Sequence, residues 1–194
     1  GADAAVRPAG PADAAAVGAI HARAWRSSYA VLLPEDVRAG LEPDALAAAW
    51  RSAVSSPPSP RHRLLVATAT DVVTGFAALA PAEDPDTTPA DAEVLALEVD
   101  PAHRGAGHGS RLLNAVADTA RELGFQRLLA WVPEPDGDRT AFLTGAGAVA
   151  DGARRVRGAV AGAVAGADTG DDPSPAPEGW TEIRLVAELA EAAP

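Results

Sequence analysis

The segment that most constrains this chain is a predicted strand, a glycine-rich turn and a helix, which follow one another without a break. The apolar run over 92–99 is typical of a buried strand, and apolar residues recur at helical spacing over 109–123. Between them stand Gly105, Gly107 and Gly109. Glycine lets the backbone approach a ligand closely, and the free amides at a helix N-terminus favour an anion. The segment therefore predicts a binding site for a phosphate or pyrophosphate group.

Three kinds of phosphate-binding turn have glycines at a similar spacing. A P-loop requires a lysine after its glycines, and the chain contains no lysine. A dinucleotide fingerprint has the spacing G-x-G-x-x-G on the first strand of a βαβ unit, whereas this chain has G-x-G-x-G in mid-chain. The third kind, R-x-x-G-x-G, is met by Arg104, Gly107 and Gly109. Taken alone, that motif leaves a purely structural glycine turn as the alternative.

The R-x-x-G-x-G spacing resembles the acetyl-CoA pyrophosphate motif of the GNAT superfamily of N-acetyltransferases. The Val-Asp-Pro lead-in at 99–101 and the two leucines at 112–113 are also similar to that motif. Residues 20–34 resemble the first helix pair of one bacterial branch of the superfamily, and a genome rich in G+C fits the alanine-rich composition. Residues 131–147 are similar to that branch's W-V-x-E-x-N…A-F-Y-x-x-x-G-F segment.

This resemblance covers residues 4–157 and 180–189, and it implies a single acetyltransferase domain over residues 1–194. The implied fold class is α/β of the α+β type: a mixed, mostly antiparallel sheet of about seven strands flanked by helices, with the fourth and fifth strands splayed around CoA. The residue pattern itself predicts strands at 4–8, 63–70, 72–80, 92–99, 126–132, 148–157 and 180–189, and helices at 11–29, from 34, at 43–54, 109–123 and 138–144. A low-complexity segment at 158–179 is expected to be a mobile loop.

The resemblance implies acetyl transfer from acetyl-CoA to an amine by direct attack, without a covalent enzyme intermediate. Backbone groups of Leu97, Glu98 and Val99 would bind the acetyl oxygen and the pantetheine arm, because a fixed N–H there stabilises the charge of the tetrahedral state. Backbone amides of the glycine turn would bind the pyrophosphate; they belong to Arg104, Gly105, Ala106, Gly107, His108, Gly109 and Ser110. The four histidines show no ligand spacing, so the sequence predicts no metal site.

Two positions of the implied site depart from the family pattern. Leu143 stands where the family often has a tyrosine that protonates the leaving thiolate, which leucine cannot do. Asp136, assigned to the cofactor site, stands where asparagine is common.

Tyr29 is the only tyrosine of the chain and lies at the end of the first predicted helix, which lines the acceptor side in this branch. Tyr29 is therefore the candidate acid, and a packing tyrosine is the alternative.

Two glutamates lie on the fourth predicted strand. Glu93 matches a glutamate that acts as general base in related enzymes, either directly or through water. A strand-end glutamate that faces solvent or pairs with an arginine is the alternative interpretation. Simple alternation along the strand places Glu98 on the side opposite to Glu93, which favours a structural contact for Glu98.

Composition narrows the choice of partners. The net charge of −11 argues against nucleic acid, because phosphate binding requires clustered cations, and it is explained by solubility or by attraction of a cationic substrate. The acceptor is expected to be a small-molecule or peptide amine, with a slight preference for a cationic one because of the acidic segment 81–91. The absence of a leader and of a long apolar run predicts a cytoplasmic protein with no membrane partner.

Two further alternatives stay open at the level of sequence. The lost tyrosine at position 143 also fits a non-catalytic acyl-CoA-binding module with a regulatory or sensing role. Many relatives in the family are dimers, so a second copy of the chain is a candidate partner. The absence of cysteine excludes thiol nucleophiles and thiolate metal sites in either case.

Overall fold

The computed structural model describes residues 3–33, 38–157 and 180–190. Its elements in chain order are β1 (Ala4–Pro8), η1 (Pro11–Asp13), α1 (Ala14–Ser28), α3 (Pro43–Ser55), β2 (Arg63–Ala69), β3 (Val72–Pro81), β4 (Asp91–Val99), η2 (Pro101–His103), α4 (His108–Glu122), β5 (Arg127–Pro133), α5 (Gly137–Gly145), β6 (Val149–Arg157) and β7 (Trp180–Glu188). The expected loop over 158–179 and the first residues of the helix expected from 34 lie outside the described residues.

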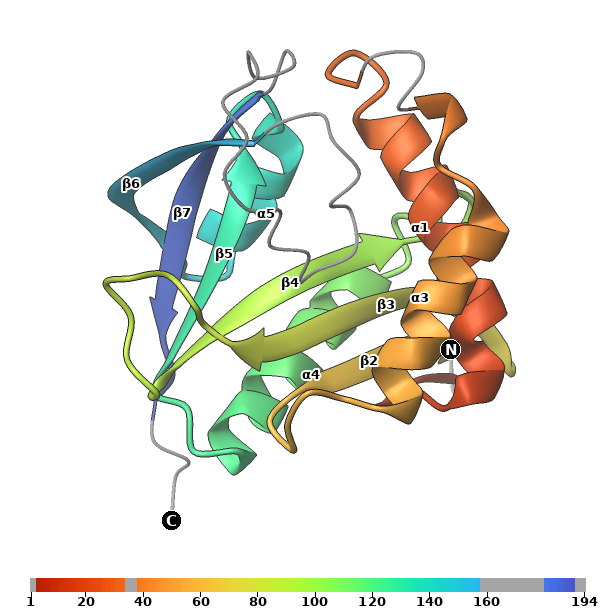
Figure 1. The fold of residues 1–194 in the computed structure, drawn as a ribbon, viewed down its shortest axis with the longest axis horizontal. Helices are drawn as coiled ribbons and strands as arrows, with labels where there is room; N and C mark the ends of the chain where they lie inside the picture. The colour runs from red at the N-terminus through yellow and green to blue at the C-terminus, as the bar shows by residue number, and fades with distance from the viewer. Residues whose placement is uncertain (1–2, 34–37, 158–179, 191–194) are drawn as a thin grey trace.

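Seven strands form one mixed sheet in the order β1-β2-β3-β4-β5-β7-β6 (Figure 1). Every neighbouring pair is antiparallel except β4 and β5, which run parallel. This arrangement confirms the expected α/β class with a mixed, mostly antiparallel sheet. β2 and β3 form a hairpin, and its turn places both Thr70 and Asp71 at positive φ, as a tight hairpin turn demands.

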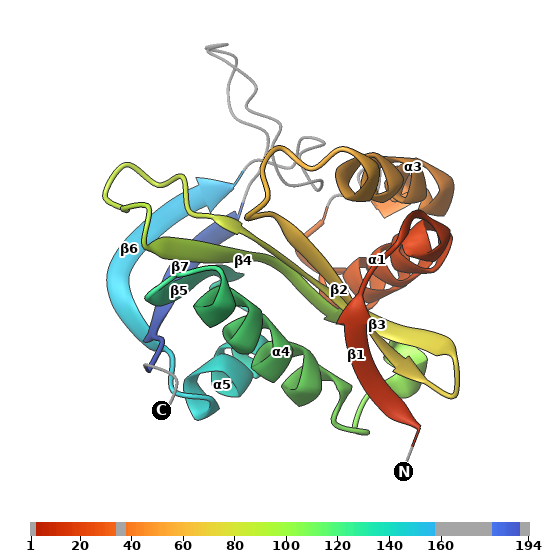
Figure 2. The ribbon, with the colours of Figure 1, turned by 90° about the horizontal axis from the view of Figure 1, so that it is seen from below.

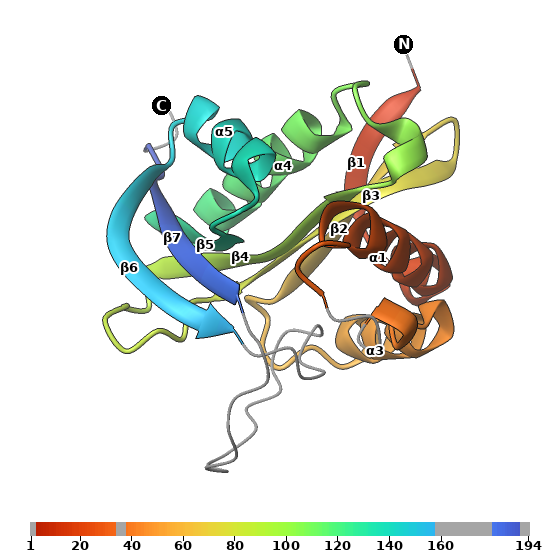
Figure 3. The ribbon, with the colours of Figure 1, turned by 90° about the horizontal axis from the view of Figure 1, so that it is seen from above.

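The helices cover both faces of the sheet. Figures 2 and 3 show α1 and α3 on one face, and α4 with α5 on the other. On the α4 face, Leu112 and Val116 pack into the main apolar cluster of the sheet. On the α1 and α3 face, Ile20 and Trp50 pack against Phe76. Amphipathic helices therefore hold the sheet from both sides, and the β4–β5 boundary lies between the two layers.

β4 and β5 are paired only at their first residues. Only Asp91, Ala92 and Glu93 pair with β5, opposite Arg127–Leu129. Beyond Glu93 the two strands continue to Val99 and Pro133 without further pairing. The second half of β4 therefore presents one unpaired backbone edge, as expected for two strands that splay apart.

A β-bulge in β4 corrects the expectation for Glu98. Ala80 pairs with Glu93, but Ala78 pairs with Ala96, so Leu95 is an extra residue in the strand. One inserted residue reverses the alternation of side chains beyond it. Glu98, opposite Phe76, consequently lies on the same face as Glu93, the face that α1 and α3 cover. The prediction of opposite faces was wrong, because regular alternation does not anticipate a bulge.

Candidate active site

The glycine turn follows directly on the unpaired edge of β4. Gly105 and Gly107 adopt φ values of +79° and +80°, which favour glycine, and Gly107 is the residue that precedes α4. Asp100 fixes the start of the turn: its buried carboxylate accepts the Ala102 N–H at 3.1 Å and pairs with Arg23 of α1 at 2.7 Å. The first amides of α4 are thereby held at the mouth of the gap between β4 and β5.

Two arginines flank this turn in different ways. Arg111, which the sequence interpretation did not assign, folds back over the turn and donates to Ala106 O at 2.8 Å. The same nitrogen lies 3.1 Å from Nδ1 of His108, whose side chain is buried. Arg104 instead turns toward the end of α1, where its guanidinium bonds the hydroxyls of Ser27 and Ser28 at 3.4 and 3.2 Å. Cationic side chains therefore stand on both sides of the turn.

An arginine from α5 crosses the gap to the edge of β4. Nη1 of Arg139 donates to Leu97 O at 2.7 Å, and Nη2 lies 2.9 Å from Oε2 of Glu98. Asp136, which caps α5 by accepting the Arg139 N–H at 3.1 Å, also lies 3.4 Å from the guanidinium. Glu98 is therefore a buried ion-pair partner, and burial raises the pKa of its carboxyl above the usual range.

Tyr29 reaches the same cluster from the end of α1. Its side chain is buried and lies with its ring 5.0 Å from Trp25, beside Trp180 of β7. Burial raises the pKa of its phenol above the usual range, and the carboxylates of Glu98 and Asp136 add to that shift. Tyr29 thus packs, as the alternative interpretation expects, and it borders the cluster formed by Glu98, Asp136 and Arg139.

Glu93 lies at the point where β4 and β5 separate. Its side chain is half-buried, and burial raises the pKa of its carboxyl to about 7, while the carboxylates of Asp84 and Glu182 push it in the same direction. The guanidinium groups of Arg155 and Arg157 oppose this shift. A carboxyl group with a pKa near neutrality can both accept and release a proton under physiological conditions.

The acidic segment that follows β3 is tied to the sheet by ion pairs. Asp84 and Asp86 pair with Arg184 at 3.1 and 2.5 Å, and Asp91 pairs with Arg127 at 3.0 Å. These three carboxylates hold the loop against β5 and β7 through arginines of those strands. Because Arg184 is also shared with Asp151, the ion pairs do not cancel the negative charge of this segment.

Leu143 is buried in an apolar cluster. It is buried with Val132 of β5 and Leu185 of β7, on the face of α5 that also carries Arg139 one turn earlier. The described residues thus offer no acid at the position where the family pattern has its tyrosine. They also contain no group of three histidine, aspartate or glutamate side chains placed to hold a metal ion.

Comparisons with known proteins agree with this geometry. The profile of the Acetyltransferase (GNAT) family matches residues 20–147. Among solved structures, YncA of Salmonella typhimurium with its cofactor acetyl-CoA is 22% identical, with a TM-score of 0.68 over 99% of this chain and 97% of that one. PaiA N-acetyltransferase of Thermoplasma acidophilum, in complex with coenzyme A, is 16% identical, with a TM-score of 0.66 over 95% and 98%. No curated protein sequence matches the chain.

A third solved structure, the ribosomal-protein-alanine N-acetyltransferase of Brucella melitensis, is 19% identical, with a TM-score of 0.67 over 95% of this chain and 99% of that one. Identities this low establish a shared fold. Within the described part of the chain, no helix has the length and apolar character needed to cross a membrane.

Proposed function

The chain belongs to the GNAT family of acetyltransferases and is an acyltransferase, and we propose that it transfers the acetyl group of acetyl-CoA to a primary amine by direct attack in a ternary complex. The observation that carries the proposal is the opening between β4 and β5, which begins at Glu93 and leads to the glycine turn. One end of this opening offers backbone amides for an anion, and the other end offers a carboxylate for an amine.

The residues of the turn fit acetyl-CoA. The backbone at Gly105 and Gly107 is left-handed and carries no Cβ, and the first amides of α4 point outward at the positive end of the helix dipole. Arg104 and Arg111 add positive charge beside the turn. When bound, acetyl-CoA would supply a thioester whose acetyl group is ready for transfer to an amine.

The edge of β4 supplies a hydrogen-bond donor for the developing negative charge. In an extended strand, the N–H and C=O of one residue point to the same edge. Leu97 O accepts from Arg139 of α5, so the Leu97 N–H also faces the gap. We assign this N–H to the thioester oxygen, because a preorganised donor at that point stabilises the oxyanion of the tetrahedral state.

Glu93 is the proposed general base. A primary amine with a pKa of about 10 arrives as an ammonium ion, and its first proton passes to the Glu93 carboxylate. The nitrogen lone pair then forms the new C–N bond, and the C–S bond breaks with its electron pair on sulfur. The second proton leaves the nitrogen for the thiolate or water. A thiolate with a pKa near 8.5 is a tolerable leaving group at neutral pH, which lets the reaction proceed with Leu143 in place of an acid.

The experiment that tests this function is a thiol-release assay with acetyl-CoA and a panel of primary amines. Because the chain contains no cysteine, released CoA is the only thiol in the reaction. The proposal expects amine-dependent release of CoA and an N-acetylated product by mass spectrometry. Calorimetric binding of acetyl-CoA without release for any amine would instead favour an acyl-CoA-binding module. Failure to bind acetyl-CoA at all would contradict the assignment of the glycine turn.

A further inference from the structure

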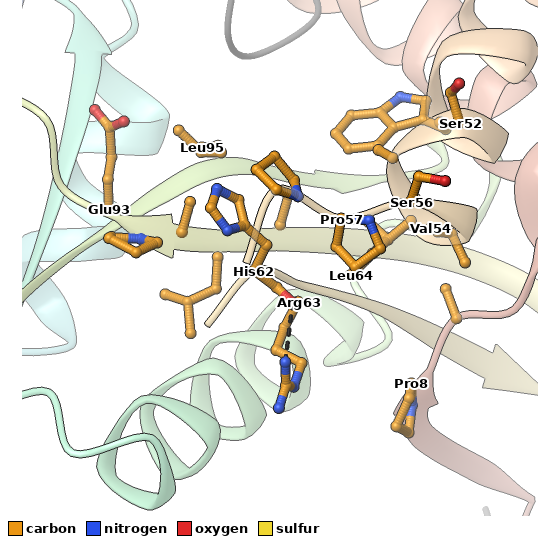
Figure 4. A pocket seen from close by; sticks show the side chains of 18 of the residues that line it. Pro8, Ser52, Val54, Ser56, Pro57, His62, Arg63, Leu64, Glu93 and Leu95 are labelled. Atoms are coloured by element: carbon orange, nitrogen blue, oxygen red, sulfur yellow. Dashed lines mark hydrogen bonds between the residues drawn. The ribbon is translucent and has the colours of Figure 1, made fainter. Parts of the chain in front are cut away.

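A cavity of about 570 Å³ lies on the α1 and α3 face of the sheet and ends at Glu93 (Figure 4). Its floor is formed by β2, β3 and β4, and its far wall by the end of α3 and the residues that follow it. Figure 4 shows Glu93 and Leu95 at one end and Pro8 and Val54 toward the other. The cavity thus extends away from the β4–β5 opening, on the sheet face opposite to α4.

The walls of this cavity are mostly apolar. Leu64, Ala78 and Leu95 line it from the strands, and Trp50 and Ala53 line it from α3. Its volume falls within the range of about 300–1,000 Å³ that is typical of small-molecule sites. An apolar wall leaves a polar ligand group without a hydrogen-bond partner, and that loss costs free energy. The body of a ligand that fills this cavity is therefore apolar.

Negative charge is concentrated at the end of the cavity next to β4. Glu93 and Glu83 both line that end. Among the described residues, no hydrogen bond or salt bridge of 4.0 Å or less involves the Glu93 carboxylate, whereas Asp84, Asp86 and Asp91 are all paired with arginines. The cationic side chain at the cavity, Arg63, donates to the backbone carbonyls of Pro60 and His62. Arg155 and Arg157, whose guanidinium groups also act on Glu93, both pair with Glu182. With Glu83 beside Glu93, the charge at the reacting end complements an ammonium group.

We propose that this cavity holds the acceptor, and that the acceptor is a primary amine carried on an apolar body, with its ammonium group at Glu93 and its body against Leu64, Ala78 and Trp50. This inference rests on the proposed function, because Glu93 marks where the amine meets the thioester. The cofactor then enters from the glycine turn beside α4, and the acceptor enters from the opposite face. The two substrates meet where β4 and β5 separate.

The test is a series of primary alkylamines of increasing length, from ethylamine through butylamine to hexylamine, in the thiol-release assay. Each CH2 group transferred from water to the cavity is worth about 0.8 kcal/mol, so kcat/KM should rise about fourfold per added CH2. The KM for acetyl-CoA should stay constant across the series.

Ala53→Leu places three additional carbon atoms inside the cavity and provides the matched variant. It should lower kcat/KM for hexylamine about tenfold or more, a size of effect expected when a pocket loses room for a few methylenes. Its kcat/KM for ethylamine and its KM for acetyl-CoA should remain within about twofold of the wild-type values. Ala48→Leu, on the exposed side of the same helix, serves as the control and should leave all three values unchanged.

The outcomes separate this inference from the proposed function. Activity that is independent of alkyl length, or equal losses for ethylamine and hexylamine in Ala53→Leu, would overturn the cavity assignment and leave the acetyltransferase function intact. If no amine releases CoA, the proposed function fails, and calorimetry of hexylamine binding decides the cavity separately. Binding to wild type that Ala53→Leu abolishes supports the cavity, and equal or absent binding in both proteins overturns it.

Discussion

The two ends of the β4–β5 opening are built in different ways. At the glycine turn, the groups proposed to face the ligand are backbone amides, and their arrangement depends on Gly105 and Gly107 at positive φ. At the Glu93 end, the surface consists of side chains from β2, β3, β4 and α3, which are far apart in the sequence. A site made of backbone groups requires residues at fixed local spacing, so it can be recognised as a motif in the sequence. A site made of side chains from distant segments is assembled by tertiary packing and has no such motif.

This contrast has a consequence for specificity. In the proposed function, backbone amides recognise the pyrophosphate of CoA, which is the same whichever amine reacts, and they depend little on neighbouring side chains. Side chains at the other end can change one by one without disturbing the strands that carry them. The proposed function therefore has a constant cofactor end and a variable acceptor end, and Arg139 joins α5 to the edge of β4 between them.

Glu93→Gln should produce the largest loss and should affect only the acceptor end. If Glu93 removes the proton of the amine, kcat should fall by roughly 10²–10⁴, because glutamine cannot accept that proton. The affinity for acetyl-CoA, measured by calorimetry, should be unchanged. A fall in kcat of less than about threefold would place the base elsewhere, and a parallel loss of acetyl-CoA affinity would remove the separation of the two ends.

Arg139→Met should lower the free energy of unfolding by breaking the ion pair between α5 and β4. The substitution leaves Glu98 buried without its partner, and breaking a buried ion pair costs about 3–5 kcal/mol of unfolding free energy. Urea unfolding should show this loss. Adding Glu98→Gln should recover more than half of it, because the uncompensated charge is then removed. Equal stability of the single and double variants would mean that Glu98 is not ionised in the fold.

Gly107→Val should weaken the binding of acetyl-CoA and leave the acceptor end of the site unchanged. A valine at a φ of +80° is strained by about 1–3 kcal/mol, and its Cβ would lie 3.2 Å from Nη1 of Arg111. In the proposed function, its side chain would also intrude on the pyrophosphate. We expect acetyl-CoA affinity to fall about a hundredfold in calorimetry, a loss of about 2.7 kcal/mol. Gly124→Val is the matched control: its φ of +83° carries the same strain at the other end of α4. Similar affinities in the two variants would show that strain, not contact with the ligand, explains the loss.

Leu143→Tyr and Tyr29→Phe should have the smallest effects. A thiolate leaves without assistance near neutral pH, so restoring an acid at position 143 should change kcat less than tenfold, under about 1.4 kcal/mol of barrier. Leu143 is buried, so some loss of stability from overpacking accompanies this change. Tyr29→Phe should be nearly silent in kcat, because the packing of its ring is preserved. A large drop in kcat for Tyr29→Phe would identify Tyr29 as the acid.

The sequence predicted the parts of this molecule that depend on local patterns. The glycine turn follows from the local spacing of Arg104, Gly107 and Gly109, and the family resemblance that this motif carries implied a mixed, mostly antiparallel sheet whose fourth and fifth strands splay apart. The bulge at Leu95 could not be predicted, since it depends on how β3 and β4 pair, and it brought Glu98 to the face of Glu93. The predicted side for Glu98 was therefore wrong, whereas the predicted structural contact was confirmed by its ion pair with Arg139.

The side-chain partners at the site were also beyond sequence analysis. Arg139 and Arg111 carry no motif signal, because one charged residue on an amphipathic helix looks like any other solvated residue. The cavity beside Glu93 draws on α3 and on the strands that precede β4, and only packing brings those segments together. The family resemblance predicted where the reaction centre would lie, but the side chains that surround each predicted residue could be identified only from the structure.

The most direct test of a proton transfer to Glu93 is the pH dependence of kcat/KM for an alkylamine at saturating acetyl-CoA, measured for wild type and Glu93→Gln. The ratio kcat/KM reports the groups of the enzyme before the amine binds, and the amine, with a pKa of about 10, titrates above the pH range of the test. Burial raises the pKa of Glu93 to about 7, and the base must be ionised, so kcat/KM should rise with pH through that value and then level off. We expect this step to disappear in Glu93→Gln. The same step in the variant, or a wild-type kcat/KM that is flat between about pH 5.5 and 8.5, would contradict a proton transfer to Glu93 at the mouth of the β4–β5 opening.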